Sequence, residues 1–253
     1  MKVIFNKDRN NIMSKTAIII PARYGSSRLE GKPLIEVNDK PIIQWVYEKA
    51  QQAQLADMII VATDDKRIFD AVKSFGGEVE MTSTEHKCGS DRIREVVERH
   101  PEISYIVNLQ GDEPMIKPES VNAVINNVKN DANADISTLV RVIDDEDDIK
   151  NPNLVKCVFD INGYALYFSR SPIPYNRNTG ISKTYGHIGI YGYKREALLR
   201  MTALNQTPLE KTESLEQLRA IENGMKIKVT VVDFVPVGID TLEDLAKFKS
   251  LVS

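Results

Sequence analysis

Three basic side chains and two glycines crowd into one short stretch, "PARYGSSRLEGKPL" at residues 21–34, just after the apolar run 17–20. Arg23, Arg28 and Lys32 supply positive charge, and the backbone N–H groups of residues 25–27 can form a concave nest for an anion. Ligands of an open α/β sheet lie beyond the carboxyl ends of its strands. A loop in that position therefore suits a polyphosphate, and the alternative is a solvated basic loop without a ligand.

The spacing within this loop excludes two common phosphate motifs. A Walker-type loop has four residues between its glycine and the Gly-Lys pair, followed by Ser or Thr. Here five residues separate Gly25 from Gly31, and Pro33, which has no N–H to donate, follows Lys32. The Gly-x-Gly-x-x-Gly fingerprint of dinucleotide-binding folds is also missing from this position.

Two aspartates stand where a metal ligand could lie. Asp112 follows the apolar segment "YIVNLQ" and a glycine, so it is expected at the carboxyl end of a strand, where a carboxylate can bind a hard cation. Asp240 precedes the last predicted helix. The alternatives are a turn or helix-cap role for Asp112 and an N-cap role for Asp240.

The first half of the chain alternates predicted strands with amphipathic helices. Asp64 or Asp65 is expected to cap the second helix, and Ser90 the third. Continuous apolar strands between such helices predict a parallel sheet covered on both faces. The predicted strands are 16–20, 58–62, 78–81 and 105–109, and the predicted helices begin at residue 41, at 65–66, directly after Ser90 and at 118.

The second half changes character. Two apolar segments, 155–160 and 164–169, flank Asn162-Gly163, which predicts a hairpin with a type I′ turn. Residues 185–193 alternate like a strand, and 226–232 form a further one. Residues 209–224 are predicted to be one helix that ends at Gly224, and residues 241–251 a last helix.

Composition narrows the class of protein. The 253 residues carry 33 Lys and Arg against 36 Asp and Glu, a net charge of −3, which argues against a general nucleic-acid binder. Two distant cysteines, Cys88 and Cys157, form neither a zinc motif nor a disulfide framework, and they favour a cytosolic, cytoplasmic protein. No apolar run is long enough for a membrane span, and the start does not read as a signal peptide.

The domain organisation predicted from the sequence is simple. Residues 1–14 are interpreted as a mobile N-terminal extension, or as a start upstream of Met13, with a short strand over residues 3–5 as the alternative. Because no Pro/Gly/Ser-rich linker divides the rest, residues 15–253 are expected to form one domain. An inserted antiparallel part is expected at about residues 155–193.

The loop 21–34 and six further segments together resemble one enzyme family, the CMP-Kdo synthetases, or 3-deoxy-manno-octulosonate cytidylyltransferases. The segments are "VATDD" (61–65), "NLQGDEP" (108–114), "GYALYFSRSPIP" (163–174), "HIGIYGY" (187–193), "LEQLRAIENGMKI" (215–227) and "GIDTLEDL" (238–245). The resemblance spans about residues 16–250. It implies an α/β fold with a mixed, mostly parallel, Rossmann-like nucleotidyltransferase sheet flanked by helices.

The resemblance also implies a reaction. CMP is transferred from CTP to the anomeric hydroxyl of the sugar acid Kdo, with release of pyrophosphate, in synthesis of the lipopolysaccharide inner core. Mg²⁺ is the implied cofactor, CTP and Kdo are the implied small-molecule partners, and a homodimer is the implied assembly. The alternatives are the same reaction on 8-amino-Kdo or another sugar acid and, from a different class, a nucleotide-binding module without turnover.

The family's site positions fall on particular residues of this chain. The resemblance implies catalytic roles for Arg23, Lys32, Asp112 and Asp240, of which the two aspartates would hold the metal. Nucleotide-binding positions are Arg23, Ser27, Arg28, Lys32 and Arg92, although Arg92 could instead be an exposed helix residue. Sugar-binding positions are Gln110, Arg170, His187, Tyr191 and Glu216.

Two of the sugar positions are linked by strand geometry. His187 and Tyr191 are four residues apart on one predicted strand, so their side chains are expected on the same face. Without the resemblance, His187 would be taken for a packed or surface residue. Glu216 would be taken for part of a solvated helix face.

Overall fold

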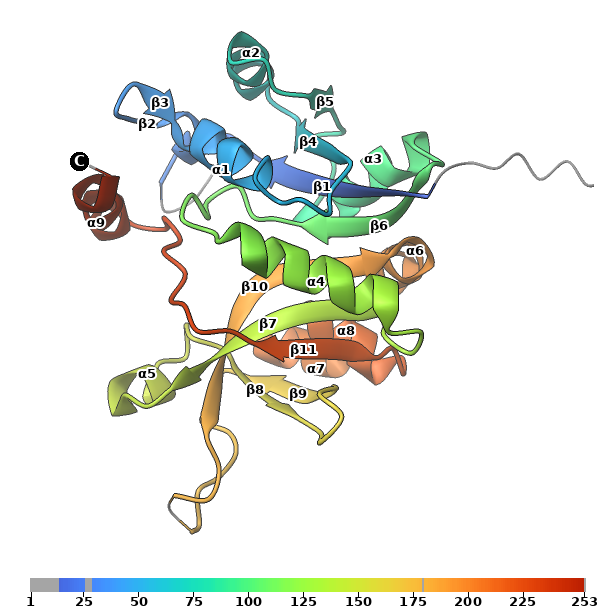
Figure 1. Ribbon diagram of the computed structural model, residues 1–253, viewed down its shortest axis with the longest axis vertical. Coiled ribbons are helices and arrows are strands. Elements are labelled where there is room, and N and C mark those ends of the chain that lie inside the picture. Colours follow the sequence, from blue (N-terminus) through green and yellow to red (C-terminus); the bar gives the residue numbers. More distant parts are fainter. Residues whose placement is uncertain (1–13, 26–28, 179, 253) are drawn as a thin grey trace, which may run out of the picture.

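The computed structural model describes residues 14–25, 29–178 and 180–252, so the prediction for residues 1–13 lies outside the described part. A twisted sheet runs through the whole molecule, in the strand order β11-β7-β10-β6-β1-β4-β5 (Figure 1). β10 is antiparallel to both of its neighbours, and the other pairs in this order are parallel. The strands are β1 Lys15–Ala22, β4 Met58–Thr63, β5 Val79–Met81, β6 Ile103–Asn108, β7 Ile136–Ile143, β10 Thr184–Lys194 and β11 Ile227–Val231.

Helices cover both faces of this sheet, as the alternation of strands and amphipathic helices predicts. On β1, Ile18 and Ile20 pack into one apolar cluster while Ala17 and Ile19 pack into the other, because successive strand side chains point to opposite faces. The helices are α1 Ile42–Ala50, α2 Lys66–Ser74, α3 Gly89–Arg99, α4 Pro118–Asn130, α5 Glu146–Lys150, α6 Arg195–Ala203, α7 Pro208–Glu213, α8 Gln217–Glu222 and α9 Leu242–Val252.

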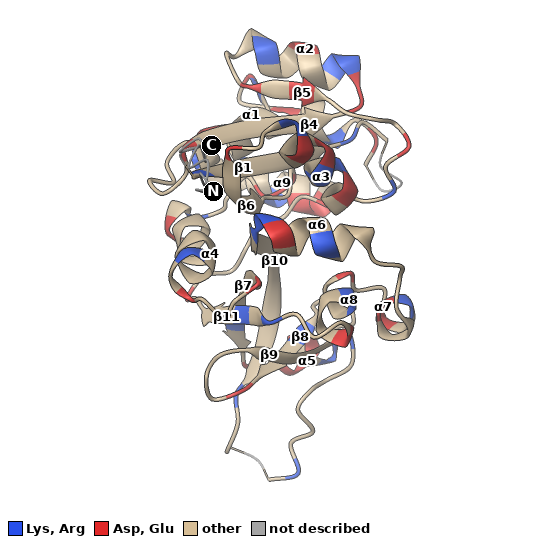
Figure 2. Cartoon of the chain, turned by 90° about the vertical axis from the view of Figure 1, so that its right-hand side faces the viewer, with Lys and Arg blue, Asp and Glu red and all other residues tan. Residues whose placement is uncertain are grey.

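Smaller elements complete the chain. β8 Lys156–Phe159 and β9 Ala165–Ser169 form a hairpin that pairs with β10 at Gly186, which gives the sheet its antiparallel part. A 3₁₀ turn, η1 Lys32–Leu34, precedes the short ribbon of β2 Glu36–Val37 and β3 Lys40–Pro41. Helices α2, α3 and α6 carry charges of both signs (Figure 2), and no described helix is long and apolar enough to cross a membrane.

Most predicted elements are confirmed, but three local predictions are wrong. The hairpin turn is not type I′: Gly163 has φ 77°, Asn162 does not share a positive φ, and Gly163 N–H donates to Asp160 at 2.9 Å. That arrangement is a type I turn followed by a left-handed glycine. Ser90 does not cap α3, which begins one residue earlier after Cys88. Of the two cap candidates for α2, Asp65 accepts the backbone N–H of Arg67.

The third wrong prediction concerns residues 209–224, which do not form one helix. Ser214 adopts a left-handed conformation, φ 53° and ψ 49°, and separates α7 from α8. A buried ion pair between Arg219 and Glu210 bridges the break, with a 2.8 Å bond from Nε to Oε2. Tertiary contacts therefore overrode the helical periodicity. β7, α5 and α6 had no counterpart among the predicted elements.

Candidate active site

The carboxyl ends of β1 and β6 open side by side into a pocket of about 340 Å³. The two strands are parallel neighbours with Ile19 opposite Asn108, so the loop after β1 and the segment after β6 leave the sheet together. The pocket is lined by Pro21, Ala22, Arg23, Gly25, Lys32, Pro33, Gln110, Gly111, Asp112 and Asp240. We call it the phosphate pocket.

A charged triad stands in the phosphate pocket. Lys32 Nζ lies 2.6 Å from Asp112 Oδ2 and 3.0 Å from Asp240 Oδ1. Asp240 lies near the C-terminal end of the chain. It is held beside Asp112 because the backbone N–H of the preceding residue, Ile239, donates to the Asp112 carbonyl at 2.9 Å. Burial by itself would lower the pKa of Lys32, but the two carboxylates outweigh it and raise that pKa. The two predicted metal ligands thus surround one cation, the Lys32 ammonium.

Gly31 brings Lys32 into this position. Its φ of 66° is left-handed, and a Cβ there would come within 3.0 Å of the Tyr24 ring. The Gly31 N–H donates to the Tyr24 carbonyl at 2.9 Å, which closes the loop, and the Arg67 guanidinium stacks 3.2 Å from the centre of the Tyr24 ring. The loop is therefore held at Tyr24 and Gly31. Ser27 and Arg28, two of the predicted nucleotide-binding residues, lie outside the described part.

Arg23 provides a second cation at the pocket wall. Its Nη2 is buried without a hydrogen-bond partner in the described structure, a costly state for a guanidinium N–H. Nearby, Glu113 Oε2 is also buried without a partner. Burial, together with the Asp112 and Asp240 carboxylates, raises the pKa of Glu113 to about 8. The unpaired Arg23 donor fits an anion that enters the phosphate pocket.

A second, smaller pocket of about 120 Å³ adjoins the first, because Gln110 lines both. It brings together three of the predicted sugar positions, Gln110, Tyr191 and Glu216, and we call it the sugar pocket. Its other lining residues are Ser90, Asn108, Tyr193, Met201 and Gln217. Glu216 also lines a larger pocket of about 670 Å³.

The helix break at Ser214 places Glu216 in the wall of the sugar pocket. Glu216 Oε2 accepts a 3.0 Å hydrogen bond from Ser90 Oγ, and Cys88 Sγ lies 3.7 Å from its Oε1. Burial raises the pKa of Glu216, although Ser90 acts in the opposite direction. The solvated helix face that periodicity alone would predict is therefore not what the structure shows.

His187 lies on the same face of β10 as Tyr191, with 5.4 Å between their ring centres, although a bulge interrupts the strand between Ile188 and Tyr191. It is not among the residues that line the sugar pocket. Its Nε2 is 2.9 Å from Thr138 Oγ1, and its ring packs edge-on against Phe168. Burial lowers the pKa of His187 to about 3, so the imidazole is neutral at pH 7.

Arg170 is engaged elsewhere. Its Nε donates to the Glu213 carbonyl at 2.7 Å and its Nη1 to the Pro152 carbonyl at 2.9 Å. These bonds hold the end of β9 against the end of α7. Arg170 is not among the lining residues of either pocket.

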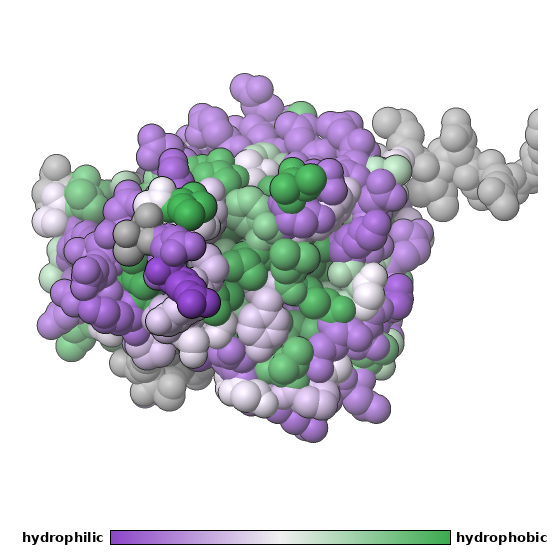
Figure 3. All heavy atoms as spheres, turned by 90° about the horizontal axis from the view of Figure 1, so that it is seen from below, coloured by the Kyte–Doolittle hydropathy of each residue, from purple (hydrophilic) through white to green (hydrophobic). Residues whose placement is uncertain are grey.

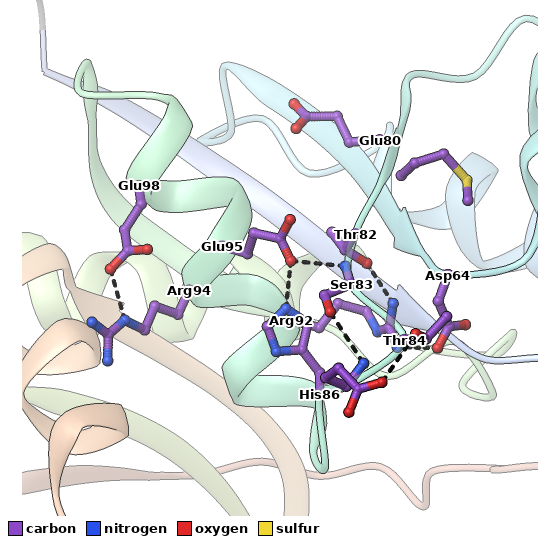
Figure 4. Close-up of polar contacts among 12 residues, drawn as sticks. Asp64, Glu80, Thr82, Ser83, Thr84, His86, Arg92, Arg94, Glu95 and Glu98 are labelled. Carbon is purple, nitrogen blue, oxygen red and sulfur yellow. Dashed lines mark hydrogen bonds and ion pairs between the residues drawn. The ribbon is translucent and has the colours of Figure 1, made fainter.

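Arg92 is fully buried, so its alternative as an exposed helix residue is wrong. Its Nη2 donates to Asp64 Oδ2 at 2.5 Å and its Nη1 to Thr82. Figure 4 shows the guanidinium pointing between these two side chains, which come from the ends of β4 and β5. Asp64 is thus an ion-pair partner rather than a helix cap, and Arg92 does not line the phosphate pocket.

Sequence reasoning missed four polar lining residues of the sugar pocket: Ser90, Asn108, Tyr193 and Gln217. Asn108 could have been found, because it is a polar residue that ends an apolar strand two positions before Gln110. Gln217 follows Glu216 directly. Ser90 and Tyr193 carried no local signal, since each looks like an ordinary cap or strand residue.

Known proteins share this arrangement over nearly the whole chain. A family model described as Cytidylyltransferase matches residues 17–227. The 3-deoxy-manno-octulosonate cytidylyltransferase of Thermodesulfovibrio yellowstonii is 52% identical over 243 residues, covering 91% of this chain and 95% of that protein. The enzyme of the same name from Fusobacterium nucleatum is 49% identical, covering 90% and 92%.

Solved structures agree with these relatives. A structure of CMP:2-keto-3-deoxy-manno-octonic acid synthetase complexed with CTP superimposes with a TM-score of 0.91 at 43% identity, and covers 94% of this chain and 98% of that one. A 4-diphosphocytidyl-2C-methyl-D-erythritol synthase from Anaerococcus prevotii, 16% identical with a TM-score of 0.63 over 94% and 98% of the two chains, shares the fold. This chain therefore belongs to the cytidylyltransferase family, among the 3-deoxy-manno-octulosonate cytidylyltransferases, or CMP-Kdo synthetases.

Proposed function

We propose that this chain transfers CMP from CTP to the anomeric hydroxyl of Kdo, with release of pyrophosphate, for lipopolysaccharide inner-core synthesis. The observation that carries the proposal is the shared wall of the two pockets. Gln110 stands between a pocket with a basic loop and paired carboxylates and a pocket of hydrogen-bonding side chains. A triphosphate in the first and a sugar hydroxyl in the second would meet at this wall.

The transfer of CMP depends mainly on the positioning of the two substrates and on the stabilisation of charge. A bond forms between the hydroxyl oxygen and the α-phosphorus, the hydroxyl proton is lost to solvent, and the bond from that phosphorus to the pyrophosphate oxygen breaks. Charge on the transferring group is stabilised best by fixed donors and cations. Arg23, with its unpaired buried Nη2, and Lys32 are placed to neutralise the triphosphate, and Gln110 and Glu216 to orient the sugar.

Asp112 and Asp240 would hold Mg²⁺. They already converge on one cation, Lys32 Nζ, which is the arrangement a divalent ion needs. No group of three or more His, Cys, Asp or Glu within the described residues is arranged to hold a metal alone. One or two carboxylates with substrate phosphates and water are a common Mg²⁺ set. When bound there, Mg²⁺ would polarise a phosphoryl oxygen and offset its charge.

The test is pyrophosphate release by the purified chain with Mg²⁺, CTP and Kdo. We expect turnover with CTP and a clear preference over ATP and GTP, with little release when the sugar is omitted. A parallel arm with 8-amino-Kdo compares catalytic efficiencies for the two sugars. Binding of CTP without release for any sugar acid would favour the non-catalytic nucleotide-binding module instead.

Substitutions on β10 are expected to act on the sugar. Tyr191→Phe removes one hydroxyl from the sugar pocket, and His187→Ala removes the ring packed beside Tyr191. A lost hydrogen bond costs about 0.5–1.5 kcal/mol, and more if a buried partner such as Thr138 is left unsatisfied. We expect the KM for Kdo to rise about three- to thirtyfold, with His187→Ala the worse change. Steady-state kinetics with each substrate varied in turn will measure this. If the KM for CTP rose more than the KM for Kdo, the sugar would not bind beside this strand.

The proposal includes a homodimer formed through the face seen in Figure 3, where hydrophobic side chains gather. Ile161, Leu166, Tyr175 and Ile181, all more than half exposed, belong to the antiparallel part and the segments that flank it. Exposed apolar side chains that gather on one face commonly mark a protein interface. We also place the enzyme in the cytoplasm, which two free cysteines support.

Leu166→Glu on β9 is expected to convert the dimer to a monomer, because a charge would be buried in the interface. Light scattering coupled to size exclusion will measure the mass. Leu251→Glu, at a comparably exposed leucine on α9, is the matched control and should leave the mass unchanged. A monomeric wild-type protein at micromolar concentration would refute this part of the proposal.

A further inference from the structure

One row of hydrogen-bonded side chains forms the floor of the sugar pocket. Gln110 Nε2 donates to Asn108 Oδ1 at 2.8 Å, and Ser90 Oγ donates to Glu216 Oε2 at 3.0 Å. Tyr193 joins the two halves through side-chain hydrogen bonds with Asn108 and Ser90. The five residues come from β6 and the segment after it, from β10, from α3 and from the start of α8.

The direction of each bond in the row follows from what the groups can donate. An ionised carboxylate only accepts, so Ser90 gives its hydrogen to Glu216 and can accept from the Tyr193 hydroxyl. Asn108 Oδ1 accepts from the Gln110 amide, and the contact with Asn108 lowers the pKa of Tyr193, as expected if Asn108 Nδ2 donates to the Tyr193 oxygen. The bonds from Gln110 to Asn108 and from Ser90 to Glu216 both point along the row toward Glu216.

Burial separates the row into a fixed middle and two accessible ends. Ser90, Tyr193 and Asn108 are 2%, 3% and 4% exposed, whereas Gln110 and the Glu216 side chain are partly exposed. Buried polar groups have to keep their partners, because leaving one unsatisfied is costly. The middle residues consequently cannot rotate toward a ligand, and they determine which atoms the ends present.

We propose that Asn108, Tyr193 and Ser90 are positioning residues that fix the hydrogen-bonding pattern of the sugar pocket. With its Nε2 held by Asn108, Gln110 presents Oε1 as an acceptor, and Glu216 presents its carboxylate. The pocket then offers acceptors at both ends and selects a polyol that donates from its hydroxyls. The inference rests on the proposed function of this pocket as the sugar site.

Two matched tyrosine variants provide the first test. Tyr193→Phe removes the hydroxyl that joins the row and keeps the ring, and it should raise the KM for Kdo about three- to tenfold with less than a twofold change in the KM for CTP. Tyr164→Phe is the control, because its hydroxyl binds Asp131 at 2.6 Å and lies outside both pockets. It should change neither constant.

A double-mutant cycle separates positioning from direct contact. Ser90→Ala should weaken Kdo binding in the wild-type background, and its effect should fall below twofold when Glu216→Ala is already present, because Ser90 would act through Glu216. Ser90→Thr, which keeps the hydroxyl, should restore most of the loss. Equal effects of Ser90→Ala in the two backgrounds would overturn the proposal, as would no effect of Glu216→Ala on Kdo binding.

Calorimetric titration of Kdo, with an unreactive CTP analogue present, provides a readout independent of turnover. If the wild-type chain binds Kdo but releases no pyrophosphate, the proposed reaction fails while the cycle still decides the role of Ser90. Absence of Kdo binding would overturn both. Thermal unfolding of each variant identifies any effect that comes from a damaged fold.

Discussion

Replacing either Asp112 or Asp240 with asparagine is expected to lower turnover at least about a hundredfold while the fold stays intact. The amide keeps the shape of the carboxylate and loses its charge. A bound metal supplies several kcal/mol of charge stabilisation in the transition state, and each 1.4 kcal/mol is a factor of ten in rate. Pyrophosphate release at saturating CTP measures the rate, and circular dichroism checks the fold.

Asp148→Asn is the matched control, because that carboxylate pairs with Arg141 at 2.9 Å and lies outside both pockets. It should leave turnover within about a factor of two. If Asp112→Asn and Asp240→Asn both turned over like the wild-type protein, neither aspartate would hold a catalytic metal. A loss that excess Mg²⁺ reverses would instead show weakened metal affinity and support the assignment.

Replacing Lys32 with methionine is expected to have two opposite effects. Without nucleotide, Mn²⁺ should bind at least about tenfold more tightly, because the ammonium that lies 2.6 Å and 3.0 Å from the two carboxylates no longer competes with the metal. CTP affinity and turnover should both fall, because a cation facing the triphosphate is lost. Electron paramagnetic resonance of Mn²⁺ and calorimetry with CTP measure the two effects separately.

Lys40→Met serves as the comparison for this second prediction, since its ammonium pairs with Glu48 at 2.8 Å outside the phosphate pocket. It should alter neither affinity. Unchanged or weaker Mn²⁺ binding in Lys32→Met would mean that the lysine does not stand in for the metal. Metal and nucleotide binding would then be independent, whereas the expected result makes them cooperative through Lys32.

Local patterns determined much of the fold. Continuous apolar runs specify strands that are covered on both faces, and the 3.6-residue stripes specify the helices between them. Because a strand–helix alternation leads to a parallel sheet, the loop after β1 and the segment after β6 had to open at one edge. That β1 and β6 are neighbours, which brings Lys32 within 2.6 Å of Asp112, follows from the strand order of the assembled sheet.

The tertiary structure decided what depends on contacts between distant segments. The helical pattern at 209–224 is intact in the sequence, yet a left-handed Ser214 and the Arg219–Glu210 pair interrupt it and turn Glu216 toward Ser90. Arg92 faces inward because its guanidinium donates to Asp64 and Thr82, which lie at the ends of two strands.

The floor of the sugar pocket is the clearest case, because Asn108, Tyr193 and Ser90 come from three elements that are far apart in the chain. Hydrophobic periodicity reports which face of an element is buried, and it carries no information about which polar groups meet there. A buried hydrogen bond depends on both of its partners. A single segment of sequence shows that a polar side chain is present, and only the assembled fold determines which group that side chain binds.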